Sequence, residues 1–289
     1  MIGVEPTANT AGVAQAKGIE SIVDFFGADL ARREFVAKER LANLICGNNV
    51  YAHVPDINDF TAGLKAALAP SGVISLEFPH LLQLLRENQF DTIYHEHFSY
   101  LSLGVVQRIF ASQGLTVFDV ERLTTHGGSL RVFGRHAGNS DLPVTDRVDA
   151  LLAEERAEGL EDEAIYLGFQ AKIDSIRAEF LSFLLEQKRA GKMVAAYGAA
   201  AKGNTLLNYC GVKGPDLLSF VCDLSPHKQG RLLPGSHIPV LAPVALEERR
   251  PDFIVILPWN LTSEVTRQLS YAREWGAQFV VAIPNLQII

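Results

Sequence analysis

Cysteine is scarce in this chain, with only three among 289 residues. Cys46, Cys210 and Cys222 are far apart and their number is odd. Their spacing excludes both the short paired motifs of a zinc site and a disulfide framework. We expect all three to be small buried side chains in a protein of the reducing cytoplasm, with no bound metal.

Long apolar runs and an excess of positive charge are also lacking. No apolar run approaches the ~18 residues that a membrane span requires. The first ten residues lack a basic region followed by an apolar one, so no signal peptide is expected. The net charge of −7 excludes a generic nucleic-acid binder, which would present a basic face. We therefore expect neither a membrane nor a nucleic acid as partner, although a local basic pocket for a diphosphate stays open.

What is present is ample apolar material, 48% of the residues, in a chain long enough for two domains. In the first half, short apolar runs alternate with helix-like segments. This order predicts a parallel sheet, and the segments after it predict a helix and an antiparallel pair. Strands are expected at 2–4, 21–23, 41–46, 73–77, 115–122 and 129–133, and helices at 8–17, 28–40, 56–68 and 105–113. Together they outline an incomplete class I methyltransferase fold.

The second half repeats the alternation after a long charged segment without proline. Residues 144–189 predict one or two connecting helices. Beyond them we expect strands at 193–197, 217–222, 253–257 and 279–283, a small-residue loop at 198–203, and helices at 205–209 and 263–275. The predicted fold class is α/β. Two Rossmann-like, doubly wound lobes, 1–140 and 191–289, are joined by a helical linker at 141–190.

Glu5 follows a short strand and is followed by Pro6 and a helix. In doubly wound folds an acid at this point can accept hydrogen bonds from both ribose hydroxyls of a nucleotide. A solvated carboxylate near a helix N-terminus is the alternative. The strand and glycine-rich turn that usually precede such an acid would lie before Met1, so we expect the first lobe to lack them.

Three polar residues follow the strand at 41–46, where ligands bind in open α/β sheets. Asn48, Asn49 and His53 are expected to line a cofactor pocket. The alternative is an asparagine-rich turn that leads into a helix capped by Asp56.

The densest group of titratable side chains is Tyr94, His95, Glu96 and His97. If the segment is extended, the two histidines share one face and Tyr94 and Glu96 share the other. A histidine near its usual pKa can accept a proton at neutral pH, and a nearby glutamate can orient it. A zinc site that uses both histidines, for which further ligands are needed, and a structural role are the alternatives.

Small residues also mark two turns. Gly127 and Gly128 permit positive φ or close approach to a ligand, and a plain hairpin turn is the alternative. Gly198 to Asn204 joins a strand to a helix with the spacing Gly-x-Ala-x-x-Gly, one glycine short of the dinucleotide motif. Lys202 can add charge at that helix N-terminus, and Asp223 stands where the motif has its ribose acid. An NAD(P)-dependent oxidoreductase is therefore an alternative function.

Trp259 and Asn260 end a strand of the second lobe on the edge where ligands bind. Trp259 is expected either to stack on a base or to cover the core.

Taken together, these motifs resemble the S-adenosylmethionine (SAM)-dependent C-methyltransferases that act on nucleotide-linked keto-sugars. They occur in the family order and cover nearly the whole chain. The segments are Gly3–Pro6, Asn48–Asp56, Tyr94–Tyr100, His126–Ser129 and Gly198–Asn204. The zinc-binding cysteines of the family and its glycine-rich SAM loop have no counterpart here.

The resemblance implies a role for each matched residue. His97 matches the general base, and Tyr94, Glu96 and His53 match residues around the reacting sugar. Glu5, Pro6, Asn48 and Asn49 are expected to bind SAM. The resemblance and the motifs assign the nucleotide-diphosphate keto-sugar to Gly198, Lys202, Asn204, Trp259 and Asn260.

The implied reaction removes a proton from a carbon next to a ketone and transfers a methyl group to the enolate carbon. A non-catalytic, truncated methyltransferase is the remaining alternative. The oligomeric state is not predicted.

Overall fold

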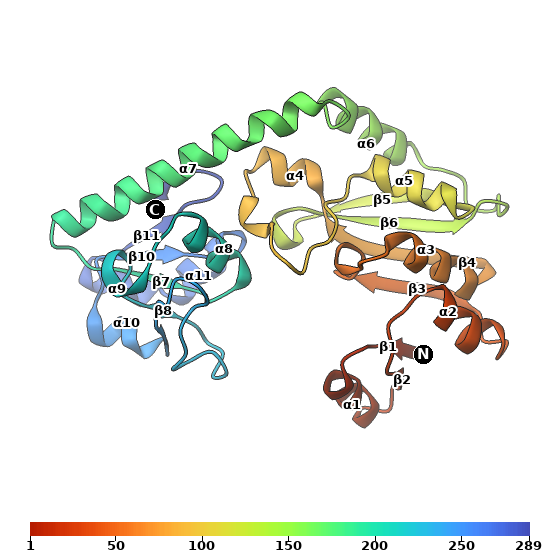
Figure 1. The fold of residues 1–289 in the computed structure, drawn as a ribbon, viewed down its shortest axis with the longest axis horizontal. Helices are drawn as coiled ribbons and strands as arrows, with labels where there is room; N and C mark the ends of the chain where they lie inside the picture. Colours follow the sequence, from red (N-terminus) through yellow and green to blue (C-terminus); the bar gives the residue numbers. More distant parts are fainter. The chain divides into compact units, whose positions relative to one another are not determined.

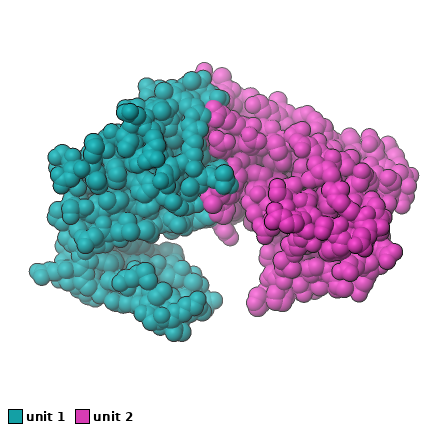
Figure 2. All heavy atoms as spheres, turned by 180° about the vertical axis from the view of Figure 1, so that it is seen from behind, with its two compact units in different colours: residues 1–81, 98–124, 128–161 teal, residues 82–97, 125–127, 162–289 magenta.

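A computed structural model describes all residues from Met1 to Ile289. The chain divides into two compact units whose sequences interleave (Figure 2). Unit 1 contains residues 1–81, 98–124 and 128–161, and unit 2 contains residues 82–97, 125–127 and 162–289. No helix has the length and apolar character needed to cross a bilayer.

Unit 1 begins with a small βαβ element (Figure 1). The strands β1 (Ile2–Val4) and β2 (Glu20–Ile22) pair in parallel, and α1 (Ala8–Ala16) connects them. No ladder joins these strands to the larger sheet of the unit. They are held to it by apolar contacts, since Ile2, Val4 and Ile22 pack with Phe35 and Ile45.

The main sheet of unit 1 has the order β3-β4-β6-β5. Its β3–β4 pair is parallel and its other two pairs are antiparallel, which confirms the predicted closing hairpin. The strands are β3 (Ala42–Asn48), β4 (Leu68–Pro79), β5 (Leu115–Leu123) and β6 (Ser129–His136). Helices from three parts of the chain bury one face of this sheet (Figure 1): α3 (Ile57–Ala67), α5 (Leu103–Ser112) and α6 (Asp146–Ala157).

Two helices of unit 1, α3 and α5, begin where a side chain caps them. The Asp56 carboxylate accepts hydrogen bonds from the backbone N–H groups of Asn58 and Asp59, and the Ser102 hydroxyl accepts one from Val105. Such bonds satisfy donors that the helix itself leaves unpaired. Both caps fix the point at which the chain leaves the carboxyl edge of the sheet and turns back over its face.

Unit 1 also contains a buried acid. Glu155 of α6, 4% exposed, accepts hydrogen bonds from His80 Nε2 at 2.8 Å and from the backbone N–H groups of Leu103 at 2.6 Å and Gly104 at 2.9 Å. Burial raises the pKa of this carboxyl, but the three hydrogen bonds outweigh burial and hold the pKa below its usual value. One carboxylate thus joins the end of β4, the start of α5 and the last turn of α6.

Unit 2 is a doubly wound sheet of order β12-β11-β10-β7-β8-β9, parallel except for β12 (Figure 1). Its strands are β7 (Val194–Tyr197), β8 (Val221–Cys222), β9 (Val240–Leu241), β10 (Phe253–Ile256), β11 (Gln278–Val281) and β12 (Gln287–Ile288). Its longer helices are α7 (Glu163–Arg189), α8 (Ala201–Tyr209), α10 (Val244–Arg249) and α11 (Thr262–Gln268).

Alternate residues of the central strands enter two different cores. Val194, Ala196 and Val255 pack with α7 and α8, whereas Ala195 and Ile254 pack with α10 and α11. Helices therefore cover both faces, as the predicted Rossmann-like lobe requires. The helix α7, predicted only as a linker, contributes Ile173, Ile176, Phe180, Phe183 and Leu184 to the first core.

The strand order places a topological switch between β7 and β10. From β7 the chain continues through α8 to β8 on one side, and from β10 it continues through α11 to β11 on the other. The loops that leave the carboxyl ends of β7 and β10 diverge there, which opens a crevice suited to ligands. Gly198 and Trp259 lie in these two loops.

Several predicted boundaries are wrong. The helix predicted at 28–40 is α2 (Ala28–Ala31) followed by a π-helical turn (Arg32–Val36). The helix predicted at 263–275 divides into α11 and a 3₁₀ helix (Ser270–Trp275). The strand predicted at 217–222 shrinks to two residues because the short helix α9 (Gly214–Leu217) precedes it.

The burial of the cysteines agrees with the prediction at two of three positions. Cys210 and Cys222 are buried, as expected, and burial raises the pKa of each thiol to about 12. Cys46 on β3 is exposed, so the prediction of a buried side chain is wrong there. Its side chain points to the opposite face of β3 from the neighbouring Ile45, which packs in the apolar cluster that contains Phe35.

We expect Glu155→Ala to lower the free energy of unfolding by about 3–5 kcal/mol, because His80 and two backbone donors lose a buried charged partner. Glu154→Ala is the matched control, since Glu154 is the neighbouring acid on α6 and pairs with Arg122 at the surface, and the substitution should cost about 1 kcal/mol or less. Urea titration of both variants measures the difference. Equal losses of unfolding free energy in the two variants would contradict a larger contribution of Glu155 to stability.

Candidate active site

The residues predicted to hold the cofactor lie at strand ends of unit 1. Glu5 directly follows β1, and its Oε1 accepts a hydrogen bond from the Thr7 backbone N–H at 2.8 Å, which leads the chain past Pro6 into α1. Asn48 ends β3 opposite Glu77 of β4. Asn49 has φ of 54° and donates its backbone N–H to the Glu77 carbonyl at 2.8 Å. Glu5 and Asn48 thus both occupy carboxyl ends of parallel strands, the ligand-binding edge of such sheets.

His53 ends a 3₁₀ turn, Tyr51–His53, that follows β3. Tyr51 anchors this turn, because its side chain is fully buried and its hydroxyl lies 2.8 Å from Thr61 Oγ1. Burial raises the pKa of Tyr51 well above its usual value. The Ala52 carbonyl accepts hydrogen bonds from the backbone N–H groups of Phe98 and Ser99, at 2.9 and 3.2 Å. The turn that carries His53 is therefore bound to the segment that directly follows His97.

The segment Tyr94–His97 is not extended, so the condition under which the two histidines would share one face is not met. The His97 backbone N–H donates to the Tyr94 carbonyl at 3.0 Å, which closes a turn. The turn brings the Tyr94 and His97 rings into a stack with centroids 4.4 Å apart. His95 and Glu96 are exposed at the tip.

The imidazole of His97 has a defined proton position. Its Nδ1 lies 2.8 Å from the Thr92 carbonyl oxygen. A carbonyl can only accept, so in the neutral ring Nδ1 carries the proton and Nε2 keeps the lone pair. Thr92 belongs to the 3₁₀ helix η3 (Phe90–Thr92), and its hydroxyl donates to the Gln89 carbonyl at 2.7 Å. The sequence prediction had assigned the orienting role to a glutamate, whereas this acceptor is a main-chain carbonyl.

The residues predicted to bind the substrate meet at the switch between β7 and β10. Gly198 has φ of 91°, and a Cβ there would lie 2.5 Å from the Pro258 ring, so the loops after the two strands are in contact. Lys202 donates to Asn260 Oδ1 at 3.3 Å, and its Nζ lies 4.5 Å from the centroid of the Trp259 ring. The predicted loop at 198–203 is shorter than expected, because α8 begins at Ala201 and places Lys202 on the helix.

The glycine turn at 126–128 contributes to the same place in unit 2. The His126 carbonyl accepts from Lys202 Nζ at 3.2 Å. A Cβ on Gly127 would lie 2.3 Å from the Trp259 ring, and φ at Gly127 is 91°. The predicted positive φ is confirmed, and the group that approaches Gly127 closely is the indole of Trp259.

Asn204 and Asp223 are two further polar residues of unit 2, and the second bears on the oxidoreductase alternative. Asn204 lies on α8 with its side-chain oxygen buried and without a hydrogen-bond partner. Asp223 accepts from the Ala199 and Ser225 backbone N–H groups, both at 2.8 Å, and from Lys228 at 3.2 Å. The acid that an NAD(P) site would use is thus engaged with the loop after β7, which argues against the oxidoreductase alternative.

Asp91 is a residue that the sequence analysis missed. It lies in η3, is 0% exposed, and accepts a hydrogen bond from Trp259 Nε1 at 2.8 Å. Its other oxygen is buried without a partner. Burial raises the pKa of Asp91 to about 6, against the opposing effects of Trp259 and the Lys202 charge. Burial likewise lowers the pKa of Lys202, and Asp91 partly offsets that change. The local sequence carried no signal for it, because Asn88, Gln89 and Thr92 make its surroundings polar.

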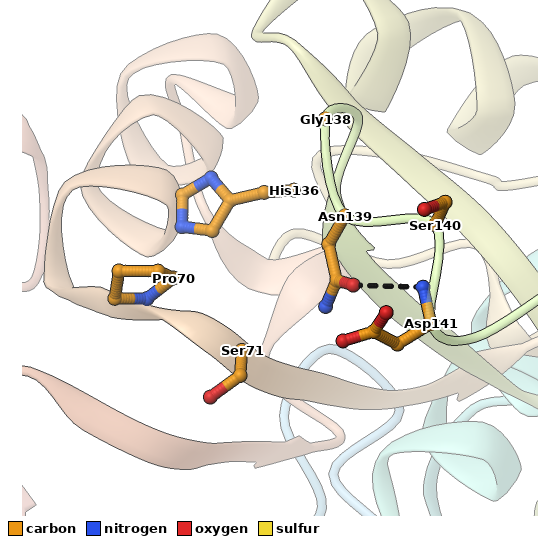
Figure 3. A pocket seen from close by; sticks show the side chains of 7 residues that line it. All are labelled: Pro70, Ser71, His136, Gly138, Asn139, Ser140 and Asp141. Atoms are coloured by element: carbon orange, nitrogen blue, oxygen red, sulfur yellow. Dashed lines mark hydrogen bonds between the residues drawn. The ribbon is translucent and has the colours of Figure 1, made fainter.

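Unit 1 also contains a shallow hollow (Figure 3). It has a volume of about 580 Å³, and its lining includes Pro70, His136 and Asp141. Asn139 accepts from the Asp141 backbone N–H at 3.0 Å. This hollow lies at the end of β6, whereas β3 and β4 carry Asn48 and Pro79 at the opposite end of the sheet. We assign it no part in the site.

The alternative of a zinc site at His95 and His97 lacks support. Nowhere does the structure gather three or more histidine, cysteine or acidic side chains in positions that could bind a metal ion. A zinc site needs at least three protein ligands.

Comparison with known families gives two matches along the chain. Residues 124–284 match the profile described as the C-methyltransferase C-terminal domain. Residues 1–120 match that of a methyltransferase domain. The two matches meet near the glycine turn at 126–128.

Among characterised proteins, the C-methyltransferase NovU of Streptomyces niveus is 40% identical over all 289 residues, which span 68% of its length. Solved structures are far more distant. Magnesium protoporphyrin IX methyltransferase of Synechocystis PCC 6803 is 13% identical, with 46% of this chain and 62% of that chain covered and a TM-score of 0.35. The N-methyltransferase NodS of Bradyrhizobium japonicum WM9 is 14% identical, with 47% and 72% covered and a TM-score of 0.34.

We expect the stability of the Asp91→Asn variant, relative to the wild type, to increase as the pH rises. The Asp91 carboxyl titrates near 3.8 in the unfolded chain and near about 6 in the folded one, so the wild type loses stability as the pH rises across that window. The asparagine variant carries no such proton. Its free energy of unfolding relative to wild type should rise by about 1–3 kcal/mol between pH 4 and pH 7. Urea titration at both pH values measures it, and a constant difference would contradict the raised pKa.

Proposed function

This chain belongs to the C-methyltransferase family and uses SAM as its methyl donor, and on that premise we propose that it methylates a carbon next to a ketone in a nucleotide-linked deoxy-sugar. His97 is the proposed base. The observation that carries the proposal is the hydrogen bond between His97 Nδ1 and the Thr92 carbonyl, because it leaves Nε2 as the basic nitrogen.

The chemistry requires little more than a base and a donor. A C–H bond beside a ketone is acidic because the negative charge that remains moves onto the carbonyl oxygen. His97 Nε2 takes that proton, and an imidazole is suited to accept it near neutral pH. The enolate oxygen then needs a hydrogen-bond donor. We assign this role to Tyr94, whose ring stacks on the imidazole, and keep His53 as the alternative donor. Glu96 is proposed to lie beside the sugar.

The nucleotide diphosphate is proposed to bind at the switch between β7 and β10. The helix α8 begins there, and its N-cap residue, Ala200, supplies no side-chain hydrogen bond. A helix N-terminus favours an anion, and Lys202 adds a positive charge beside it. Gly198, Asn204, Trp259 and Asn260 complete the proposed binding surface. This arrangement supports a diphosphate ligand, because the cation and the helix act on the same charge.

Glu5, Pro6, Asn48 and Asn49 are the residues proposed to hold SAM. Glu5 fits the ribose of SAM. Its Oε1 accepts a hydrogen bond from the Thr7 N–H, whereas its second oxygen makes no hydrogen bond. The carboxylate can therefore accept a hydrogen bond from a ribose hydroxyl. When bound, SAM supplies a methyl group made electrophilic by the sulfonium. The protein contributes position, since transfer requires the carbon and the methyl group to be aligned.

We expect His97→Asn to reduce methyl transfer by about 10²–10⁴-fold while substrate affinity is retained, because an amide can still donate to Thr92 but has no basic nitrogen. The assay uses SAM and a panel of dTDP-, CDP- and GDP-linked keto-sugars, with mass spectrometry of the product. Exchange of the substrate α-hydrogen with D₂O reports the base step separately.

His95→Asn is the matched control for that experiment, since His95 is an exposed neighbour in the same turn and should be replaced without loss. Full activity of His97→Asn would remove His97 from its role. Activity on none of the keto-sugars by the wild type would refute the proposed substrate class.

For the cofactor, we expect Glu5→Ala to weaken binding of S-adenosylhomocysteine by about 10–100-fold, because a hydrogen bond to a charged acceptor is lost. Isothermal titration calorimetry measures the affinity. Glu20→Ala is the control, because Glu20 lies at the opposite end of the β1–β2 pair and should leave binding unchanged. If both variants bind as the wild type does, the ribose assignment is wrong.

A further inference from the structure

Side-chain hydrogen bonds from Asn88, Gln89 and Asp91 join the segment that carries His97 to the rest of unit 2, and the bond of Asp91 is the one nearest His97 in the sequence. Asp91 Oδ2 accepts from the Trp259 indole N–H at 2.8 Å, across 168 positions of sequence. Asp91 is one residue before Thr92, whose carbonyl fixes the His97 tautomer. Trp259 lies in the loop after β10, at the topological switch. The bond therefore connects the proposed base to the proposed substrate surface.

The other contacts of this segment bind its flanks. The Phe90 ring packs on Tyr209 with centroids 5.2 Å apart, and Gln89 Nε2 donates to the Gly127 carbonyl at 2.7 Å. These contacts hold the start of η3. The Ile93 N–H donates to the Phe90 carbonyl at 3.0 Å, so the Thr92 carbonyl can change direction only if η3 turns as a whole. The side-chain bond of Asp91 lies next to that carbonyl and restricts how η3 can turn about its axis.

Asp91 accepts with a carboxylate, although a neutral acceptor would suffice for a hydrogen bond that only supports the fold. Burying a carboxylate is unfavourable, and one oxygen of Asp91 has no partner at all. An ionised acceptor gives a shorter and more strongly directed hydrogen bond to the indole. Lys202 lies over the face of the same indole and is the nearest compensating charge. The indole thus contacts the acid through its N–H edge and the cation through its ring face.

We infer that Asp91 is a positioning residue: through Trp259 it holds η3 so that the Thr92 carbonyl keeps the proton of His97 on Nδ1. The inference rests on the proposed role of His97 as base. Without the bond, η3 is free to turn and the Thr92 carbonyl leaves the imidazole. The proton can then occupy Nε2, where it removes the lone pair that the reaction needs.

Three variants of the full chain separate this role from simple support of the fold. Asp91→Leu removes the acceptor, Trp259→Phe removes the donor but keeps a ring, and Asp91→Asn keeps an acceptor oxygen without charge. Trp275→Phe is the matched control, because the Trp275 indole donates to the Pro251 carbonyl elsewhere in unit 2. The chain has two tryptophans, so ¹⁵N-labelled indole spectra of these variants identify the Trp259 N–H directly.

The first measurement needs no substrate. In ¹⁵N-histidine spectra, with His97 identified by the His97→Asn variant, wild type and Asp91→Asn should show the Nδ1–H tautomer. Asp91→Leu and Trp259→Phe should show a mixture of the two tautomers. An unchanged tautomer in both latter variants would overturn the inference, whether or not a substrate is known.

The second measurement is the rate of α-hydrogen exchange into D₂O with the best keto-sugar. Asp91→Leu and Trp259→Phe should each lose about tenfold or more in kcat, with Asp91→Asn restored to within about threefold of wild type. The double variant should be no slower than the slower single variant, because both remove one bond. An asparagine variant as slow as the leucine variant, or fully additive losses, would overturn the role of Asp91. Absence of exchange by the wild type would count against the proposed function alone, because the tautomer measurement still decides the inference.

Discussion

One main-chain carbonyl determines what His97 can do. The Thr92 oxygen lies 2.8 Å from Nδ1 and can only accept, so it selects which ring nitrogen retains its lone pair. No acidic partner is needed for this selection. Because the acceptor is a backbone atom, its position depends on the conformation of η3. Everything that fixes η3, including the indole of Trp259 and the packing of Phe90, therefore acts on the chemistry of one imidazole.

Much of the fold could be predicted because it follows from local patterns. The alternation of apolar runs with helix-like segments in the second half predicted a doubly wound lobe, and the two cores on the opposite faces of β7 and β10 agree with it. The sequence was insufficient where tertiary contacts decide the local structure. It left the conformation of Tyr94–His97 open, and a hydrogen bond within the segment closes it into a turn. The exposure of Cys46 depends on which face of β3 is covered, and sequence spacing carries no such information.

The site was partly predictable for the same reason. Residues that follow strands, such as Asn48 and Trp259, could be assigned to a ligand-binding edge because parallel strands share their carboxyl ends. Asp91 could not, because its partner is 168 positions away and nothing in the local sequence indicates a buried acid with an indole donor. For the glycines, the backbone conformation could be predicted but the tertiary contacts could not. Positive φ at Gly127 was predictable, whereas its contact with Trp259 depends on the tertiary fold.

The three thiols differ sharply in reactivity as a result of their positions. Cys210 and Cys222 stay protonated at neutral pH because burial raises the pKa of each to about 12, and a protonated thiol is a poor nucleophile. Cys46 is exposed on β3, two residues before Asn48. A maleimide dye should therefore attach at a single natural position. Fluorescence from that dye would report events at the carboxyl end of β3 without any engineered substitution.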